Sequence, residues 1–511
     1  MSEVDTAPAQ APPPSVRRAA TRGMVWTGSQ ALLGRLLSLA SFVVLTRYLS
    51  VQDYGVATLA NVFIAFLTLF AAAGYSAALV QQPEIEKEDL DTIFWIGLGT
   101  SVVLALAMVG AAWPLAAVFD EPRLRPVLQA LAPVFIFVAL GSTHQAILQR
   151  ELDFKRIAMA NLGANLVATT VGVVFAIVGF GVWSIVVQIL LMVSLTTAGL
   201  ALRTRYVPSP RVSWARFAPL FAFSRNQLGS SLIGWLNSRT DDFLIGAYLG
   251  TAVLGVYTVG YRVLTVMNEV LTSSIGKVAF SSFARMQGDR ERLVRGYRTA
   301  TGIGVLVSVP AFMFCLGAAP QIVRFVFGSK WEASIPVMQI LCLFGAVNVI
   351  QSFNGALLVG IGRPKTVFRV GVAGTVLQVI GFALTVSHGI QWVAVSFVVR
   401  AYLILPVGVV IAARALQTTV RETLSDTVRP ILCSLLMVGG VLAARAEGVD
   451  DLPPGLGLLA LGLVAAVLYG GSLYLFGGRV LAEFTRDVRD AYGARLRRAL
   501  PTWMRARRNA A

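Results

Sequence analysis

Long apolar runs, separated by short polar segments, follow one another along almost the whole chain. A helix needs about 20 residues to cross a bilayer, and fourteen runs are long enough. They cover residues 24–46, 55–80, 93–118, 126–149, 157–179, 181–202, 220–248, 253–279, 300–327, 333–359, 367–386, 390–412, 430–446 and 455–476. The pattern predicts an all-α integral membrane protein with 14 transmembrane helices.

The composition agrees with this class and excludes several others. Of 511 residues, 56% are hydrophobic and only 14% are charged, against about 25% charged in soluble domains. The three cysteines, Cys315, Cys342 and Cys433, lie in apolar runs, and the two histidines are far apart in sequence. Neither residue type shows metal-ligand spacing, so we expect no metal and no disulfide framework.

Both ends of the chain are polar. Residues 1–23 contain four prolines and are expected to form a disordered cytoplasmic tail, followed by an apolar run too long for a cleavable signal. Residues 478–511 are basic, with apolar positions spaced by three and four, which predicts an amphipathic helix on the cytoplasmic leaflet. A partner-binding tail is the alternative reading, and nucleic acid is not expected as a partner.

Basic residues predict the orientation. With a cytoplasmic amino terminus, 31 Lys and Arg fall on the inner side and 5 on the outer side, as the positive-inside rule requires. Both termini are then cytoplasmic. The acidic segment 81–92 is the exception on the inner side.

The chain also shows an internal duplication. Residues 48–58, YLSVQDYGVAT, match residues 248–258, YLGTAVLGVYT, at an offset of 200, and further matches follow at an offset of 210. The predicted plan is a six-helix bundle over 24–202, a cytoplasmic linker over 203–219, a second six-helix bundle over 220–413, and two extra helices over 430–476. Six spans per copy make these parallel repeats, and transporters with such repeats bind substrate in a central cavity.

Charges inside the predicted spans are the candidate functional residues, because a charge near the bilayer centre costs several kcal/mol unless it has a partner or faces water. Arg239 and Asp242 are three residues apart and predicted to pair. Arginine binds phosphate and diphosphate groups through its bidentate fork. The candidate substrate-binding cations are Arg35, Arg225, Arg239, Arg262, Lys277 and Arg400, and the candidate ion-coupling carboxylates are Asp241, Asp242 and Glu269.

The charged residues also have purely structural interpretations. The cations form structural ion pairs in one alternative, and Arg225 and Lys277 snorkel to the membrane surface in another. The carboxylates are candidates for coupling to H⁺ or Na⁺, or serve only to neutralise arginines. No nucleophile constellation and no phosphate-binding glycine loop are present, so no catalytic residue, no cofactor and no enzymatic activity are expected.

Several stretches resemble one family. GMVWTGSQALLGRLLSLASFVVLTRYLSVQDYGVATLANVF, RELDFKRIAMANL with GFGVWSIVVQ, and DDFLIGAYLGTAVLGVYTVGYRV are similar to the polysaccharide-transport proteins of the MOP exporter superfamily, the Wzx-type flippases. The resemblance spans about residues 20–410. It implies a MATE/MurJ-like fold and movement of undecaprenyl-pyrophosphate-linked oligosaccharide repeat units from the inner to the outer leaflet of the bacterial inner membrane, for exopolysaccharide, O-antigen or capsule synthesis.

The resemblance also implies roles for individual residues. The sister family that flips lipid II has cavity arginines on its first and eighth spans, which singles out Arg35 and Arg262 for the pyrophosphate. The implied partners are the lipid-linked glycan, membrane lipids and polysaccharide polymerase or export machinery. A lipid II flippase, a multidrug or cation antiporter of the same superfamily and a membrane glycosyltransferase remain the alternatives.

Overall fold

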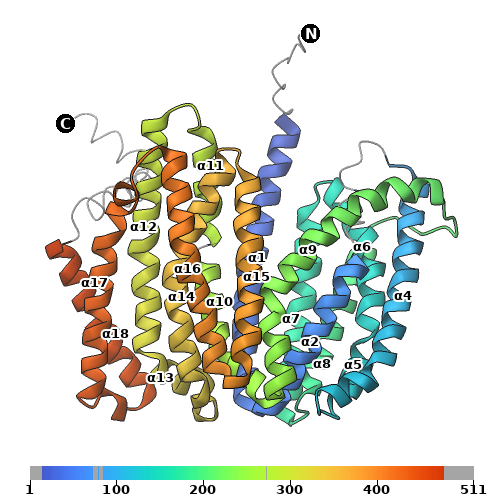
Figure 1. Cartoon of the computed structure of the whole chain (residues 1–511). Helices are drawn as coiled ribbons and strands as arrows, with labels where there is room; N and C mark the ends of the chain where they lie inside the picture. The colour runs from blue at the N-terminus through green and yellow to red at the C-terminus, as the bar shows by residue number, and fades with distance from the viewer. Residues whose placement is uncertain (1–13, 73–78, 80–84, 272, 477–511) are drawn as a thin grey trace, which may run out of the picture. The chain divides into compact units, whose positions relative to one another are not determined.

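The described part of this computed structural model is helical and contains no strand; it comprises residues 14–72, 79, 85–271 and 273–476 (Figure 1). The long helices are α1 Pro14–Tyr48, α2 Val51–Ala72, α4 Lys87–Val118, α6 Pro133–Arg150, α7 Phe154–Val178, α8 Trp183–Ala201, α9 Trp214–Leu249, α10 Thr251–Leu271, α11 Ser273–Arg285, α12 Arg290–Gly317, α14 Ile335–Gly360, α15 Pro364–Thr385, α16 Ile390–Leu416, α17 Val420–Ala446 and α18 Pro454–Phe476. Short pieces include α5 Leu124–Leu131 and α13 Ala319–Ile322. This confirms the all-α membrane class.

Twelve of the fourteen predicted spans coincide with helices that are long and apolar enough to cross a membrane, within the described residues. The predicted spans 220–248 and 253–279 are also helical, as α9 and as α10 with α11, but they carry the charged residues of interest. The count of fourteen therefore stays a prediction.

Two predicted boundaries differ from the structure. Helix α1 begins at Pro14, within the predicted tail, because proline is tolerated in a first turn and the Arg and Ala that follow are good helix formers. Helix α9 begins at Trp214, inside the predicted linker, because the charge of Arg216 hides its first turn from a hydropathy pattern. The carboxy-terminal tail predicted over 478–511 lies outside the described residues.

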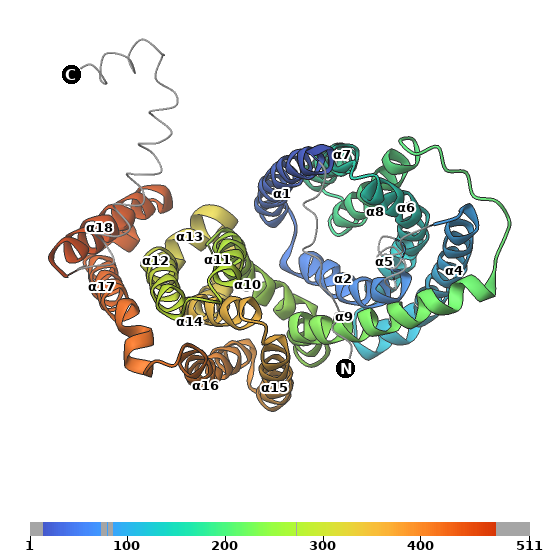
Figure 2. The ribbon, with the colours of Figure 1, turned by 90° about the horizontal axis from the view of Figure 1, so that it is seen from above.

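The chain divides into two compact units, unit 1 over Met1–Gly255 and unit 2 over Val256–Ala511. Unit 1 therefore includes α9, which the sequence analysis placed in the second bundle. The reason lies in its packing, since α9 contacts α2 and α4 and runs alongside them in Figure 2. In unit 2, α14 packs between α12 and α16, and the two extra helices attach through α12.

The joints between successive helices support the duplication. Helix α1 ends at Tyr48 and α2 begins at Val51, and α9 ends at Leu249 and α10 begins at Thr251. The repeat-equivalent glycines of these joints touch inside unit 1. A Cβ on Gly55 would lie 1.7 Å from the Thr251 carbonyl oxygen, and one on Gly255 would lie 2.5 Å from the Val51 oxygen. Only glycine allows this approach of two backbones.

The acidic segment that departed from the charge pattern has structural tasks. Asp89 and Glu86 form a reciprocal cap at the start of α4, where negative charge also suits the helix dipole. Asp91 is 1% exposed and accepts hydrogen bonds from the Tyr206 hydroxyl at 2.7 Å and the Ser209 backbone N–H at 3.0 Å. Asp91 thus holds the segment between α8 and α9, while Glu86 and Asp89 stabilise the start of α4.

The three cysteines are buried and free, so no disulfide staples the fold. Cys433 on α17 packs against Leu306 of α12 and Leu473 of α18. It acts there as a small apolar side chain.

Candidate functional site

Helix α9 carries an ion pair in a span-length helix of unit 1. The Arg239 Nη1 lies 3.0 Å from Asp242 Oδ2, which confirms the pairing predicted from their spacing. Asp242 and its neighbour Asp241 are buried, at 7% and 2% exposure. The Arg239 side chain is 36% exposed, so its charge is balanced within its own helix while part of the guanidinium group remains accessible.

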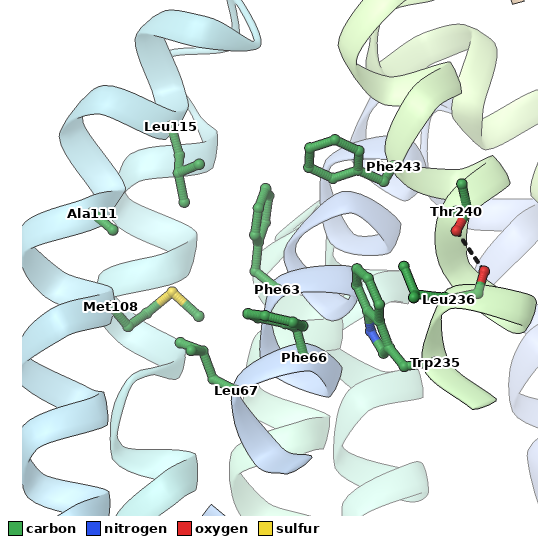
Figure 3. Close-up of a pocket in the computed structure, with 10 residues that line it drawn as sticks. All are labelled: Phe63, Phe66, Leu67, Met108, Ala111, Leu115, Trp235, Leu236, Thr240 and Phe243. Atoms are coloured by element: carbon green, nitrogen blue, oxygen red, sulfur yellow. Dashed lines mark hydrogen bonds between the residues drawn. The ribbon is translucent and has the colours of Figure 1, made fainter. Parts of the chain in front are cut away.

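An apolar cavity of about 470 Å³ lies in unit 1, between α2, α4 and α9 (Figure 3). Four of its ten lining residues are aromatic. Phe66 and Trp235 have ring centroids 4.9 Å apart, and Phe63 meets Phe243 edge-on at 6.2 Å. The remaining lining comes from Leu67, Met108, Ala111, Leu115, Leu236 and Thr240.

The cavity and the ion pair share one stretch of α9. At 100° per residue, Leu236, Thr240 and Phe243 form one stripe of this helix, and Arg239 with Asp242 form the adjacent stripe. The only hydroxyl of the lining, on Thr240, donates to the Leu236 carbonyl of its own helix. The arrangement is an apolar chamber with a charged edge, which suits an amphiphilic molecule more than a sugar or a free ion.

In unit 2, the Phe397 ring contacts one predicted cation, Arg400, and a neighbour in sequence of another. The Arg400 guanidinium carbon lies 5.0 Å from the Phe397 ring centroid and 5.9 Å from that of Phe344, within cation–π range. The Phe397 ring also meets Tyr261 edge-on at 6.0 Å. Tyr261 precedes Arg262 in α10, so Phe397 brings the helices of Arg262 and Arg400 together.

The other predicted residues are more dispersed. Arg35 is half-buried on α1 in unit 1, whereas Arg262 is half-buried and Glu269 exposed on α10 in unit 2. The side chains of Arg225 and Lys277 lie outside the described residues. The substrate and coupling roles assigned to all these charges stay predictions.

Uncharged polar residues of the bundle mostly join helices. Asn348 on α14 donates to Asn268 on α10 at 3.2 Å, and Tyr297 on α12 donates to Asn354 at 2.5 Å. His144 lies 2.5 Å from the Thr204 hydroxyl. The first two bonds join helices, as polar side chains commonly do in membrane proteins, and the third joins α6 to the segment after α8.

One polar cluster in unit 1 escaped the sequence analysis. Glu121, between α4 and α5, is 5% exposed. Its carboxylate accepts hydrogen bonds from Thr251 at 2.8 Å, and from Gln52 and Arg123 at 3.1 Å each. Arg123 also pairs with Asp53 at 3.1 Å.

The Glu121 cluster fastens the glycine crossing. Gln52 and Asp53 belong to the first turn of α2 and Thr251 begins α10. Burial acts to raise the pKa of Glu121, but the hydrogen bonds from Thr251, Gln52 and Arg123, together with the Arg123 charge, hold that pKa below its usual value. No sequence signal marks the cluster, because its members are up to 199 residues apart.

Comparison with known proteins gives one family. Residues 44–336 match the family model described as "Polysaccharide biosynthesis protein". The lipopolysaccharide biosynthesis protein WzxC of Escherichia coli K12 is 28% identical, over 71% of this chain and 74% of its own length. The succinoglycan biosynthesis transport protein ExoT of Rhizobium meliloti is 26% identical, over 65% and 67% respectively.

Two solved structures share the fold. The lipid II flippase MurJ in its inward closed conformation superposes with a TM-score of 0.68 at 15% identity, covering 91% of this chain and 99% of that one. An inward-facing multidrug resistance MATE transporter of the MOP superfamily superposes with a TM-score of 0.58 at 18% identity, covering 75% and 94%. These likenesses confirm the MATE/MurJ-like fold expected from the sequence.

Proposed function

The chain belongs to the polysaccharide biosynthesis protein family, and from this premise we propose that it is a flippase for a lipid-linked oligosaccharide. Its cargo is a polyprenyl-pyrophosphate-linked repeat unit, moved from the inner to the outer leaflet of the plasma membrane. The family match over residues 44–336 carries the proposal. Relatives named for lipopolysaccharide biosynthesis and succinoglycan transport support it.

The proposed ligands of the diphosphate are arginines within the spans. Arg35 and Arg262 come first, and Arg400 follows because its side chain is held over Phe397. Arginine stays charged at every physiological pH and its planar fork fits phosphate oxygens. The cavity beside α9 suits the apolar chain of such a lipid, since its volume is about 470 Å³ and its lining is apolar.

The Arg239–Asp242 pair is the proposed coupling element. While Asp242 is ionised, it occupies Arg239 at 3.0 Å. Protonation of Asp242 would remove that attraction and leave the guanidinium group to a phosphate. The carboxylate and the phosphate would thus compete for Arg239, so the protonation state of Asp242 would set the affinity for cargo.

A gene deletion tests the proposal. We expect viable cells that lack a surface polysaccharide and accumulate lipid-linked repeat units in the inner leaflet. Complementation with the Arg262→Gln variant should fail to restore the polymer, whereas Arg421→Gln, an exposed arginine on α17, should restore it. Normal polymer in the deletion strain would refute the proposed function.

Lipid II transport is the second candidate, because a lipid II flippase shares the fold over nearly its whole length. Under that alternative the deletion is lethal and lipid II accumulates. The two cargoes share a polyprenyl diphosphate, so the arginine variants alone do not separate them. The glycan on the accumulated lipid does.

A further inference from the structure

A second cavity, of about 540 Å³, lies in unit 2 between α11 and α12, which we call the α11–α12 pocket. Phe283 of α11 and Met286, which follows the end of α11, line it together with Gly296 and Ile303 of α12. It lies near the ends of both helices, because α11 ends at Arg285 and α12 begins at Arg290. Helix α12 is long and apolar enough to cross a membrane, and the end of such a helix lies at the lipid head groups.

Four arginines begin α12, and they divide into two pairs. Arg298 binds Asp426 of α17 through two hydrogen bonds, of 3.0 and 3.1 Å. Arg290 donates to the carbonyls of Leu416 and Gln417 at the end of α16. These two cations fasten α12 to neighbouring helices.

The other two, Arg292 and Arg295, line the α11–α12 pocket. Neither forms an ion pair with a carboxylate in the described part of the chain. The Arg295 side chain donates only to the Glu291 backbone carbonyl, at 3.4 Å. Cations near a helix amino terminus are opposed by the helix dipole, so an anion between them would relieve both the dipole and their mutual repulsion.

Farther along α12 from the two arginines, the pocket is lined first by a hydroxyl side chain and then by an apolar one. Arg292, Arg295, Thr299 and Ile303 follow one another at helical spacing along one face of α12, and Ser282 and Ala279 do so on α11. Charge, then hydroxyl, then apolar surface is the order of groups that a phosphate-bearing lipid presents along its length.

We infer that the α11–α12 pocket binds the phosphate group of an amphiphilic membrane lipid, with the phosphate on Arg292 and Arg295 and an apolar chain beside Phe283 and Ile303. A glycerophospholipid and a polyprenyl diphosphate both offer this chemistry. The site lies wholly within unit 2 and does not depend on the proposed transport function.

Native mass spectrometry of the full-length protein, titrated with dioleoylphosphatidylglycerol, tests the site. We expect saturable binding that weakens about tenfold or more in the double variant Arg292→Gln/Arg295→Gln, since two charge-assisted contacts are lost. The double variant Arg421→Gln/Arg429→Gln removes the same charge from exposed positions of α17 and should bind like the wild type. Ala300→Phe keeps both arginines and fills the pocket, so it should also bind less.

The remaining arms identify the lipid. Stronger binding of undecaprenyl diphosphate than of phosphatidylglycerol, with the same loss in both pocket variants, supports the site and makes the cargo lipid its occupant. Equal affinity for phosphatidylglycerol in the wild type and both pocket variants overturns the inference. Equal affinity for inorganic phosphate and for either lipid overturns the assignment of an amphiphilic ligand, because the apolar chain of the lipid then contributes nothing to binding.

Discussion

At the scale of single residues, contacts within the described part of the chain hold three of the charges inside the spans, Arg239, Asp242 and Arg400. Asp242 is buried and salt-bridged to Arg239, and Arg400 lies over two aromatic rings. Burying an unpaired charge costs several kcal/mol, so these contacts are conditions for folding as well as candidates for function. A variant that breaks one therefore needs a readout for stability beside the readout for transport.

A double-mutant cycle separates the two effects for the α9 pair. Asp242→Asn should destabilise the protein, because it leaves Arg239 without its carboxylate. Arg239→Gln in addition should recover part of the loss. We expect a coupling energy on the order of 1 kcal/mol, measured by thermal unfolding in detergent. Strictly additive effects would show that the pair contributes no interaction energy.

The pair was predictable and the Glu121 cluster was not. Arg239 and Asp242 are three apart on one helix, so sequence spacing alone places them together. Glu121 is 69 residues from Gln52 and 130 from Thr251. Sequence spacing does not predict which residues meet over such separations. An acidic residue between two helices is also usually exposed to solvent, so nothing in the sequence marks Glu121 as buried.

At the scale of elements, the first turns of α2 and α10 bring their backbones into close contact within unit 1. A Cβ at Gly55 would lie 1.7 Å from the Thr251 carbonyl oxygen. This oxygen belongs to the backbone of a helix, so it cannot move aside as the end of a flexible side chain could. Gly55→Ala should therefore destabilise the protein by about 2 kcal/mol or more, seen as a lower unfolding temperature in detergent. Gly110→Ala is the matched control on α4, since nothing lies within 4 Å of a Cβ there, and a loss equal to that of Gly55→Ala would contradict the packing argument.

The Glu121 cluster adds a pH dependence to the same crossing. The pKa of Glu121 is lowered from an ordinary value of 4.5. A carboxylate with a depressed folded-state pKa contributes stability that is complete above the unfolded value and is lost as the pH falls through the folded value. The wild type should thus lose its stability advantage over Glu121→Gln below about pH 4.5. An advantage unchanged between pH 7 and pH 3.5 would contradict this role of the cluster.

Hydropathy predicted the elements well and their ends less well. Apolar runs locate helices because lipid requires internally satisfied backbones. Charge at an end, as at Arg216 in α9, conceals the first turns. The break between α5 and α6 at Pro133 was missed because both pieces are apolar and read as one span.

At the scale of the whole molecule, the sequence predicted the fold class and the family but not the division into units. The duplication suggested a boundary before residue 220, whereas unit 1 extends to Gly255. Repeat matches identify equivalent helices, but they do not say which neighbour a helix packs against. That choice is made by side-chain complementarity, here between α9 and the aromatic positions of α2.

Energy coupling also belongs to this scale. Since we propose that a gradient drives the transport, the purified protein should hydrolyse no ATP above the background of an Arg262→Gln preparation. Steady ATP turnover by the wild type alone would reject gradient-driven flipping as the mechanism.

Because the three native cysteines are buried, we expect thiol-reactive dyes to leave the native chain unlabelled. A single cysteine introduced by Asp120→Cys or by Thr418→Cys can therefore report its side of the membrane without prior removal of Cys315, Cys342 or Cys433. If the amino terminus is cytoplasmic, an impermeant maleimide added to intact spheroplasts should label the first variant and spare the second. The opposite labelling would show that the amino terminus lies outside the cytoplasm, and the proposed direction of cargo transport would then be reversed.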